Sequence, residues 1–195
     1  ELGFAYLDAK RDKDAITAFQ TLASTFGESP HGAEAWFLVG ELQAAAEQKP
    51  AALTAFNNAL AKKDTPPELR ETIYYRLGET QFELDQFDPA TQTFLTQIKE
   101  FPQGPLLIPA RFRAAECLYR STKFADAFGH YDAVVTSKDA KYVPNALYRG
   151  GDCAGALKRW PDSQRMYETL IASFPDFYAV NEARYGLGLA LQNQN

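Results

Sequence analysis

The chain has 195 residues, 46% of them hydrophobic and 23% charged, a balance typical of a folded globular protein and unlike a disordered or collagen-like one. With 20 basic against 25 acidic residues its net charge is -5, so it lacks the positive field that attracts nucleic acid. No uncharged apolar run approaches the roughly 18 to 20 residues that a membrane-spanning helix requires. We therefore expect neither a nucleic-acid partner nor direct membrane insertion.

The start of the sequence has no initiator methionine and no signal-peptide pattern, and residues 1–6 already read as helix. We therefore expect the chain to be a fragment of a longer protein. No segment is a targeting signal, so the compartment does not follow from the residues.

Three columns of similar residues recur at intervals of 36 to 38 residues. The first column is small: Gly3, Gly40, Gly78, Ala115, Gly151 and Gly188. The second, 12 residues further on, is also small: Ala15, Ala52, Ala90, Ala127 and Ser163. The third, four residues later, is aromatic: Phe19, Phe56, Phe94, Tyr131 and Tyr167. A period shared by three columns indicates a repeat array.

Each repeat is predicted to be two helices joined by a short polar turn. The step of four residues to the aromatic column is about one helical turn, and apolar residues continue at helical spacing after it. Second helices are expected near residues 12–26, 50–62, 88–100, 125–137 and 161–173, with an unpaired first helix near 177–193. Pro50, Pro89 and Pro161 fall in the first turns of second helices, where a missing N–H costs nothing. Seven further prolines are expected in connections: Pro30, Pro66, Pro67, Pro102, Pro105, Pro144 and Pro175.

The fold class predicted is therefore all-α, a solenoid of antiparallel helix pairs without β structure. The small columns let two helices pack near the short end of the usual ~8 to 10 Å separation, and the aromatic rings fill the space between units. We expect a single solenoid segment over residues 1–195. Its units lie near 1–28, 29–66, 67–104, 105–141 and 142–176, followed by the unpaired helix 177–195.

The repeat resembles the tetratricopeptide repeat (TPR). The residues that carry the resemblance are Leu77-Gly78 with Phe87, Ala90, Phe94 and Pro102, and Gly151 with Trp160, Ser163, Tyr167 and Pro175. The family's usual period is about 34 residues. The longer period here is similar to that of bacterial cell-envelope members, such as the Tol-Pal system coordinator and an outer-membrane assembly lipoprotein. The resemblance implies a right-handed superhelix whose first helices line a concave groove for peptides or partner domains, and it favours a periplasmic or envelope location over the cytoplasm.

Candidate catalytic and metal-binding residues are few. His31 is expected in a connection and His130 on an exposed helix face, 99 residues apart, so neither suggests a metal ligand or a base. Cys117 and Cys153 occupy the same repeat position, where a separation of ~8 to 10 Å exceeds the ~7 Å reach of a disulfide; we expect buried fillers. Gly186-Leu187-Gly188 suits helix packing better than dinucleotide binding, because no strand precedes it. We expect no cofactor, no metal and no enzymatic activity within the chain.

An aromatic column on the first helices is the first candidate partner-binding feature. It lies three residues before each small residue and comprises Phe37, Tyr75, Phe112, Tyr148 and Tyr185. By the resemblance, this column faces the concave groove. Its rings either anchor an extended peptide or pack against the next unit and stiffen the array.

A charge ladder on the same helices is the second candidate. Arg76, Arg113 and Arg149 each precede an acid by three residues, namely Glu79, Glu116 and Asp152. Each pair shares a helix face, and each arginine can also meet the carboxylate of a neighbouring unit. The ladder is either a lattice satisfied within the protein or a surface for partner recognition.

The pattern as a whole predicts a non-enzymatic scaffold that binds another protein or a peptide through the concave groove. The alternative is a structural spacer or assembly region of a larger protein, possibly an enzyme elsewhere in its sequence. Leu187 and Leu191 on the unpaired last helix also predict weak end-to-end self-association.

Overall fold

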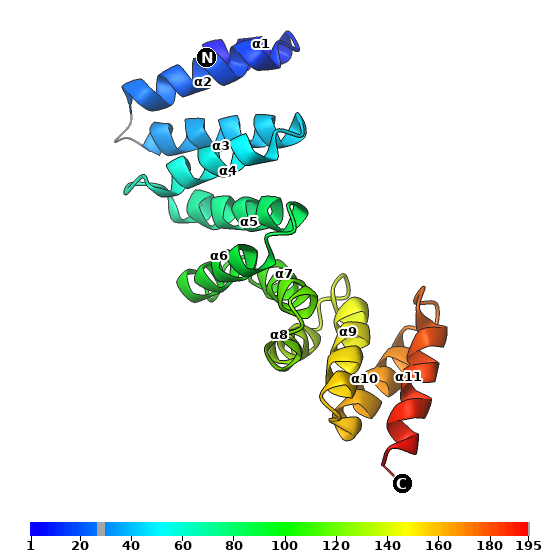
Figure 1. Ribbon diagram of the computed structural model, residues 1–195. Helices are drawn as coiled ribbons and strands as arrows, with labels where there is room; N and C mark the ends of the chain where they lie inside the picture. The colour runs from blue at the N-terminus through cyan, green and yellow to red at the C-terminus, as the bar shows by residue number, and fades with distance from the viewer. Residues whose placement is uncertain (27–29, 195) are drawn as a thin grey trace. The chain divides into compact units, whose positions relative to one another are not determined.

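The computed structural model describes residues 1–26 and 30–194, and within these ranges it contains helices and no strand (Figure 1). The predicted all-α fold class is confirmed. The first helices of the pairs are α1 (Leu2–Asp8), α3 (Pro30–Ala45), α5 (Pro67–Glu83), α7 (Leu107–Arg120), α9 (Val143–Ala156) and α11 (Val180–Gln192). The second helices are α2 (Asp12–Thr25), α4 (Lys49–Leu60), α6 (Phe87–Glu100), α8 (Phe124–Ser137) and α10 (Trp160–Ser173).

The chain divides into two compact units, Glu1–Thr93 and Phe94–Asn195, and we describe each by itself. In the N-terminal unit, each helix from α1 to α5 packs against the next along the chain. In the C-terminal unit the same holds from α7 to α11, and α9 also contacts α11. Contacts between neighbours are the pattern of a repeat array. The expected repeat boundary between residues 28 and 29 lies outside the described residues.

The second helices begin and end within two residues of the predicted bounds, and α11 begins three residues later than expected. Prolines mark the first turns of α4 and α10, as predicted. Three prolines expected in connections, Pro30, Pro67 and Pro144, instead lie in the first turns of α3, α5 and α9. The fixed φ of proline suits the first helical turn, whose N–H groups have no partner within the helix.

A left-handed residue follows the first helix of each pair. These residues are Lys10, Glu47, Asp85, Thr122 and Lys158, with φ of 56° to 58°. In the fourth of these turns, the N–H of Thr122 donates to the carbonyl of Tyr119 at 3.0 Å, and the N–H of Lys123 donates to the carbonyl of Leu118 at 2.8 Å. This is the Schellman pattern, which usually places glycine at the left-handed position. All five turns use a residue with a side chain, so they carry local strain.

The small column is required by the close approach of aromatic rings. A Cβ placed on Gly40 would lie 2.4 Å from the ring of Phe56, and one on Gly151 would lie 2.6 Å from the ring of Tyr167. Gly3 stands in the same relation to Phe19, at 2.6 Å. Real side chains do not approach so closely, so glycine permits the helix crossing at these places. The steric role predicted for this column is confirmed at Gly3, Gly40 and Gly151, whereas a Cβ on Gly188 would meet nothing within 4 Å.

The histidines differ from their predicted positions, whereas the cysteines agree. His31 lies in the first turn of α3 because the helix begins at Pro30, earlier than expected. His130 is half-buried because it lies beside Leu118 and Arg111 in a hollow next to α7, and burial lowers its pKa. Cys117 and Cys153 are buried and form no disulfide, as predicted.

Candidate functional site

The N-terminal unit carries three adjoining surface hollows, which run from α1 and α2 across α3 to the start of α5. Their volumes are about 490, 370 and 470 Å³. The first and second share Phe4 and Phe26, and the second and third share Glu34 and Leu38. Each volume lies in the range of small-ligand and peptide side-chain pockets. Most of the lining side chains are apolar, and Glu1, Asp14 and Glu34 are also among them.

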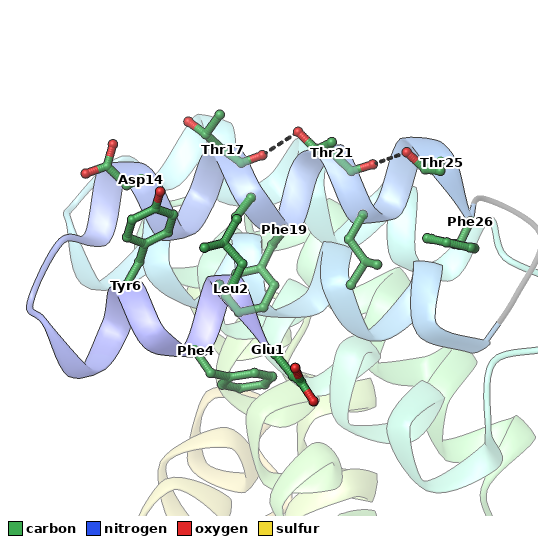
Figure 2. Close-up of a pocket in the computed structure, with 13 residues that line it drawn as sticks. Glu1, Leu2, Phe4, Tyr6, Asp14, Thr17, Phe19, Thr21, Thr25 and Phe26 are labelled. Carbon is green, nitrogen blue, oxygen red and sulfur yellow. Dashed lines mark hydrogen bonds between the residues drawn. The ribbon is translucent and has the colours of Figure 1, made fainter.

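Figure 2 shows the first hollow, with Phe19 toward its middle, Phe26 at the end of α2, and three threonines along that helix. The hydroxyl of Thr21 donates to the carbonyl of Thr17 at 2.9 Å, and that of Thr25 donates to the carbonyl of Thr21 at 2.8 Å. These hydroxyls are therefore already satisfied by their own helix. An occupant of this hollow would gain chiefly by burying apolar surface.

Phe37, a member of the predicted aromatic column, lines the third hollow. Its ring lies 6.1 Å from that of Phe56 and borders the third hollow with Leu69. Tyr75, the next member of the column, is half-buried on α5. Arg76, the first arginine of the ladder, donates from Nε to Glu41 Oε1 at 2.6 Å. It thus meets the carboxylate of the preceding repeat, one of the two arrangements that the sequence allowed.

In the C-terminal unit, Arg149 lies between two aromatic rings. Its guanidinium carbon is 4.8 Å from the ring centre of Tyr119 and 5.5 Å from that of Tyr148, suited to cation–π attraction. Its Nη1 also lies 3.5 Å from Asp152 Oδ2. Burial opposes the charge of Arg149, but the carboxylates of Glu116 and Asp152 outweigh it and raise its pKa. The arginine is therefore held largely by groups of its own chain.

Two tyrosines of the third column, Tyr131 and Tyr167, donate hydrogen bonds to acids of the charge ladder. The hydroxyl of Tyr131 donates to Glu116, and that of Tyr167 donates to Asp152 Oδ1 at 2.7 Å. Burial, followed by the nearby carboxylate and the hydrogen bond to it, raises the pKa of both tyrosines. Burial also raises the pKa of Asp152, against the opposing effects of Tyr167 and Arg149. The carboxylates of Glu116 and Asp152 therefore have hydrogen-bond donors within their own chain.

The remaining predicted site residues lie on α7, α9 and α11. The ring of Phe112 is 6.0 Å from that of Tyr131, and the ring of Tyr148 is 6.5 Å from that of Tyr167. Phe112 and Tyr148 are half-buried, as is Arg113. Tyr185 is 71% exposed. The column thus changes from half-buried rings to an open ring at α11.

Sequence reasoning missed two sets of residues. The first, Phe4 and Phe26, borders the hollows of the N-terminal unit, and no repeat column includes it. The second is Tyr119 beside Arg149, together with the hydroxyl bonds of Tyr131 and Tyr167. The change from phenylalanine to tyrosine along the third column was the available signal for these bonds.

Groups suited to a metal ion are absent from residues 1–26 and 30–194, where no three His, Cys, Asp or Glu side chains converge. Over the same residues, every helix is too short or too polar to cross a bilayer.

Comparison with known families gives a match to the tetratricopeptide repeat model over residues 1–68 and 145–195. The chain belongs to the tetratricopeptide repeat family. TPR domains generally mediate protein–protein interactions, and their helical scaffold is typically non-enzymatic. No curated protein matches the chain.

Several solved TPR structures share the fold. YrrB, described as a TPR protein with an unusual peptide-binding site, is 17% identical, with a TM-score of 0.72 over 94% of this chain and 88% of YrrB. A TPR protein from Parabacteroides merdae is 15% identical, with a TM-score of 0.71 over 98% of this chain and 71% of its own. MamA is 14% identical, with a TM-score of 0.65 over 100% of this chain and 95% of its own. At these identities the likeness concerns the fold alone.

Proposed function

We propose that this TPR chain is a binding module that holds a peptide or a partner domain against its first helices, with the N-terminal unit providing the main contact. The observation that carries the proposal is the row of apolar hollows, which includes Phe37 of the aromatic column. Peptides commonly bind by placing apolar side chains into such hollows. YrrB, which has a similar fold, is itself described as binding a peptide.

The charges around the hollows indicate the kind of peptide. Glu1, Asp14 and Glu34 are among the lining residues, whereas none of the described residues that line the three hollows is a lysine or an arginine. Complementary charge steers association and excludes partners of the wrong sign. The preferred peptide therefore carries apolar side chains flanked by lysine or arginine.

The other members of the predicted site contribute less under this proposal. Arg76 and Arg149 already pair with carboxylates of their own chain, which leaves less of their charge for a partner. The rings of Tyr75, Phe112 and Tyr148 offer half-exposed edges, and Tyr185 offers an open ring. Arg113 completes the proposed surface on α7.

The test is selection of peptides from a displayed random library on the whole chain, followed by affinity measurement with a selected peptide. Phe37→Ala should weaken binding by more than about 1 kcal/mol, as expected for an interface anchor. Phe124→Ala is the matched control, because Phe124 is also half-buried but lies on α8, where its ring packs against Tyr119. Circular dichroism should show both variants folded. Equal binding by the Phe37→Ala variant and the parent would contradict the proposal, and failure to select any peptide would favour the spacer alternative.

Self-association remains a prediction with a defined surface. All large hydrophobic side chains that are exposed in the described residues lie in α1 and α2 with Phe26, or at Tyr178 and on α11. Leu191 is among them, whereas Leu187 packs partly against the core. Sedimentation equilibrium at increasing concentration tests for weak contact between copies. The envelope-type assignment, inferred from the longer period, also remains a prediction.

A further inference from the structure

A hollow on the C-terminal unit, of about 420 Å³, is lined by residues of α6, α7 and α8. Leu95 and Leu118 form apolar walls. A Cβ added at Gly129 would meet nothing within 4 Å, so the space beside that glycine is open. Two side chains that carry nitrogen, Arg111 and His130, line the same hollow. The hollow therefore combines apolar walls with hydrogen-bond donors.

Arg111, on α7, is the first of these donors. It makes no hydrogen bond or ion pair with any residue that the structure describes, and its side chain is half-buried. Arg76 and Arg149, by contrast, each pair with a carboxylate of their own chain. A guanidinium binds most strongly when a carboxylate accepts two of its N–H groups at once. The N–H groups of Arg111 are therefore open to a ligand.

His130, on α8, is the second donor. Its Nδ1 is buried and has no hydrogen-bond partner among the described residues. A buried N–H without an acceptor is costly, so the neutral ring carries its hydrogen on Nε2. Burial, followed by the charge of Arg111, lowers the pKa of His130, and Asp126 opposes both effects. The ring is therefore neutral at neutral pH and offers one N–H to the hollow.

Asp126 is the acid of this hollow and lies one turn before His130. It stands in the first turn of α8, where the N–H groups at the start of a helix favour a carboxylate. Its side chain is exposed, so water and salt screen its repulsion of an anion. Asp126 thus weakens the attraction of the hollow for an acidic ligand without neutralising Arg111 by direct contact.

We propose that this hollow, the Arg111 hollow, binds a glutamate side chain of a partner protein. The carboxylate accepts hydrogen bonds from Arg111 and from Nε2 of His130, while its methylene groups cover the leucine walls. Charge complementarity selects an acidic ligand, and a phosphate dianion would suffer the stronger repulsion from Asp126. The hollow involves two second helices, α6 and α8, so this interaction is separate from the proposed function of the first helices.

The test is an NMR titration of the whole chain with N-acetylglutamate amide, using N-acetylglutamine amide as the uncharged control ligand. The chain has two histidines, so the ring signal of His130 reports on the Arg111 hollow and that of His31 on the N-terminal unit. The glutamate compound, at roughly millimolar concentration, should shift the His130 signal to saturation and leave the His31 signal unchanged. The glutamine compound should shift neither signal.

Three variants locate the binding. Arg111→Met keeps the length of the side chain but removes its charge, and should weaken binding about tenfold. Asp126→Asn removes the repelling charge and should tighten binding about threefold. Arg184→Met is the matched control, because Arg184 is an exposed arginine on α11, and it should bind as the parent does. Circular dichroism should show all three variants folded.

Several results would overturn the proposal: no saturable shift of the His130 signal, an equal response to the glutamine compound, or unchanged binding after Arg111→Met. Weaker binding after Asp126→Asn would contradict the role given to charge. Tighter binding of inorganic phosphate than of the glutamate compound would also overturn it, because the hollow would then select a phosphate group. None of these outcomes depends on the hollows of the N-terminal unit, so they are separate from the test of the proposed function.

Discussion

The two units seat the same column of aromatic rings with different chemistry. In the N-terminal unit the rings are Phe19 and Phe56, which fill space beside glycine and make no polar bond. The C-terminal unit begins with Phe94, and its two later rings are Tyr131 and Tyr167, whose hydroxyls donate hydrogen bonds to carboxylates of the first helices. The tyrosine hydroxyls therefore link the core to carboxylates on the first helices. Phenylalanine rings make no such link.

This difference bears on where a partner binds. In the C-terminal unit, hydroxyls and the stacked Arg149 already engage the acids of the first helices, so a partner would have to replace existing bonds. In the N-terminal unit the row of hollows exposes apolar side chains such as Phe4 and Phe26. Replacing satisfied polar bonds gains little free energy, whereas covering apolar surface gains free energy in proportion to its area.

The largest effect is expected where a ring is held on both sides. Gly151→Ala should lower the free energy of unfolding by about 2 kcal/mol, because Tyr167 is fixed by Asp152 and lies against Gly186 as well as Gly151. Gly40→Ala should cost less, since Phe56 has no hydroxyl bond to hold it. Denaturant unfolding measures both, with Gly129→Ala as the control that should be neutral or stabilising by up to about 1 kcal/mol. Equal stability of the Gly151→Ala variant and the control would disprove the tight contact.

The next effect isolates the hydroxyl that distinguishes the units. Tyr167→Phe removes the bond to the half-buried Asp152 and should lower the free energy of unfolding by about 1 to 2 kcal/mol. Tyr142→Phe is the control. Tyr142 is also half-buried, and its hydroxyl makes no hydrogen bond to any described residue, so this change should alter the free energy of unfolding little. Urea denaturation of the two variants makes the comparison. Similar losses from both changes would show that the bond to Asp152 contributes nothing particular.

A pH series tests the environment of Asp152. Burial raises the pKa of Asp152 in the folded state above its unfolded value of about 3.9, so the folded state binds this proton more tightly. Its contribution to stability is therefore most favourable below pH 4 and is lost as the pH rises through the folded pKa. The difference in stability between the Asp152→Asn variant and the parent should shift in favour of the variant over that interval. A difference independent of pH from 3 to 7 would contradict the direction of the shift.

The smallest effect concerns the turns, which the two units share. Thr122→Gly should raise the free energy of unfolding by up to about 1 kcal/mol, because a β-branched residue is strained at positive φ. Glu47→Gly, in the N-terminal unit, should gain less, since its side chain is not branched at Cβ. Thermal unfolding of the paired variants compares them. A loss of stability at both positions would show that glycine's backbone entropy outweighs the relief of strain.

The sequence predicted the helices well because their determinants are local. A column of small residues, a ring one turn after an alanine or serine, and prolines in first turns set the second helices to within two residues. The left-handed turns were not predicted, because Thr122 and its equivalents carry no glycine signal. The period of the repeats, by contrast, followed from residue spacing alone.

The candidate site was predicted only in part because it depends on which side chains meet between helices. The aromatic column correctly indicated that Phe37, Phe112 and Tyr148 share a repeat position, but periodicity did not indicate which rings border hollows. Arg76 had two carboxylates within sequence reach, and only the packing of α3 with α5 identified Glu41 as its partner. Phe26 lies outside the columns defined from the sequence, so they did not assign it to a hollow.

Both cysteines of the chain, Cys117 and Cys153, lie in the C-terminal unit and are fully buried. Burial, reinforced by Asp152 and Glu116, raises the pKa of Cys153 to about 12. Thiol reagents react with the thiolate, so at neutral pH they modify this unit only when it opens. The rate of thiol labelling therefore reports how often the C-terminal unit opens locally. The N-terminal unit has no cysteine, so its opening does not contribute to that rate.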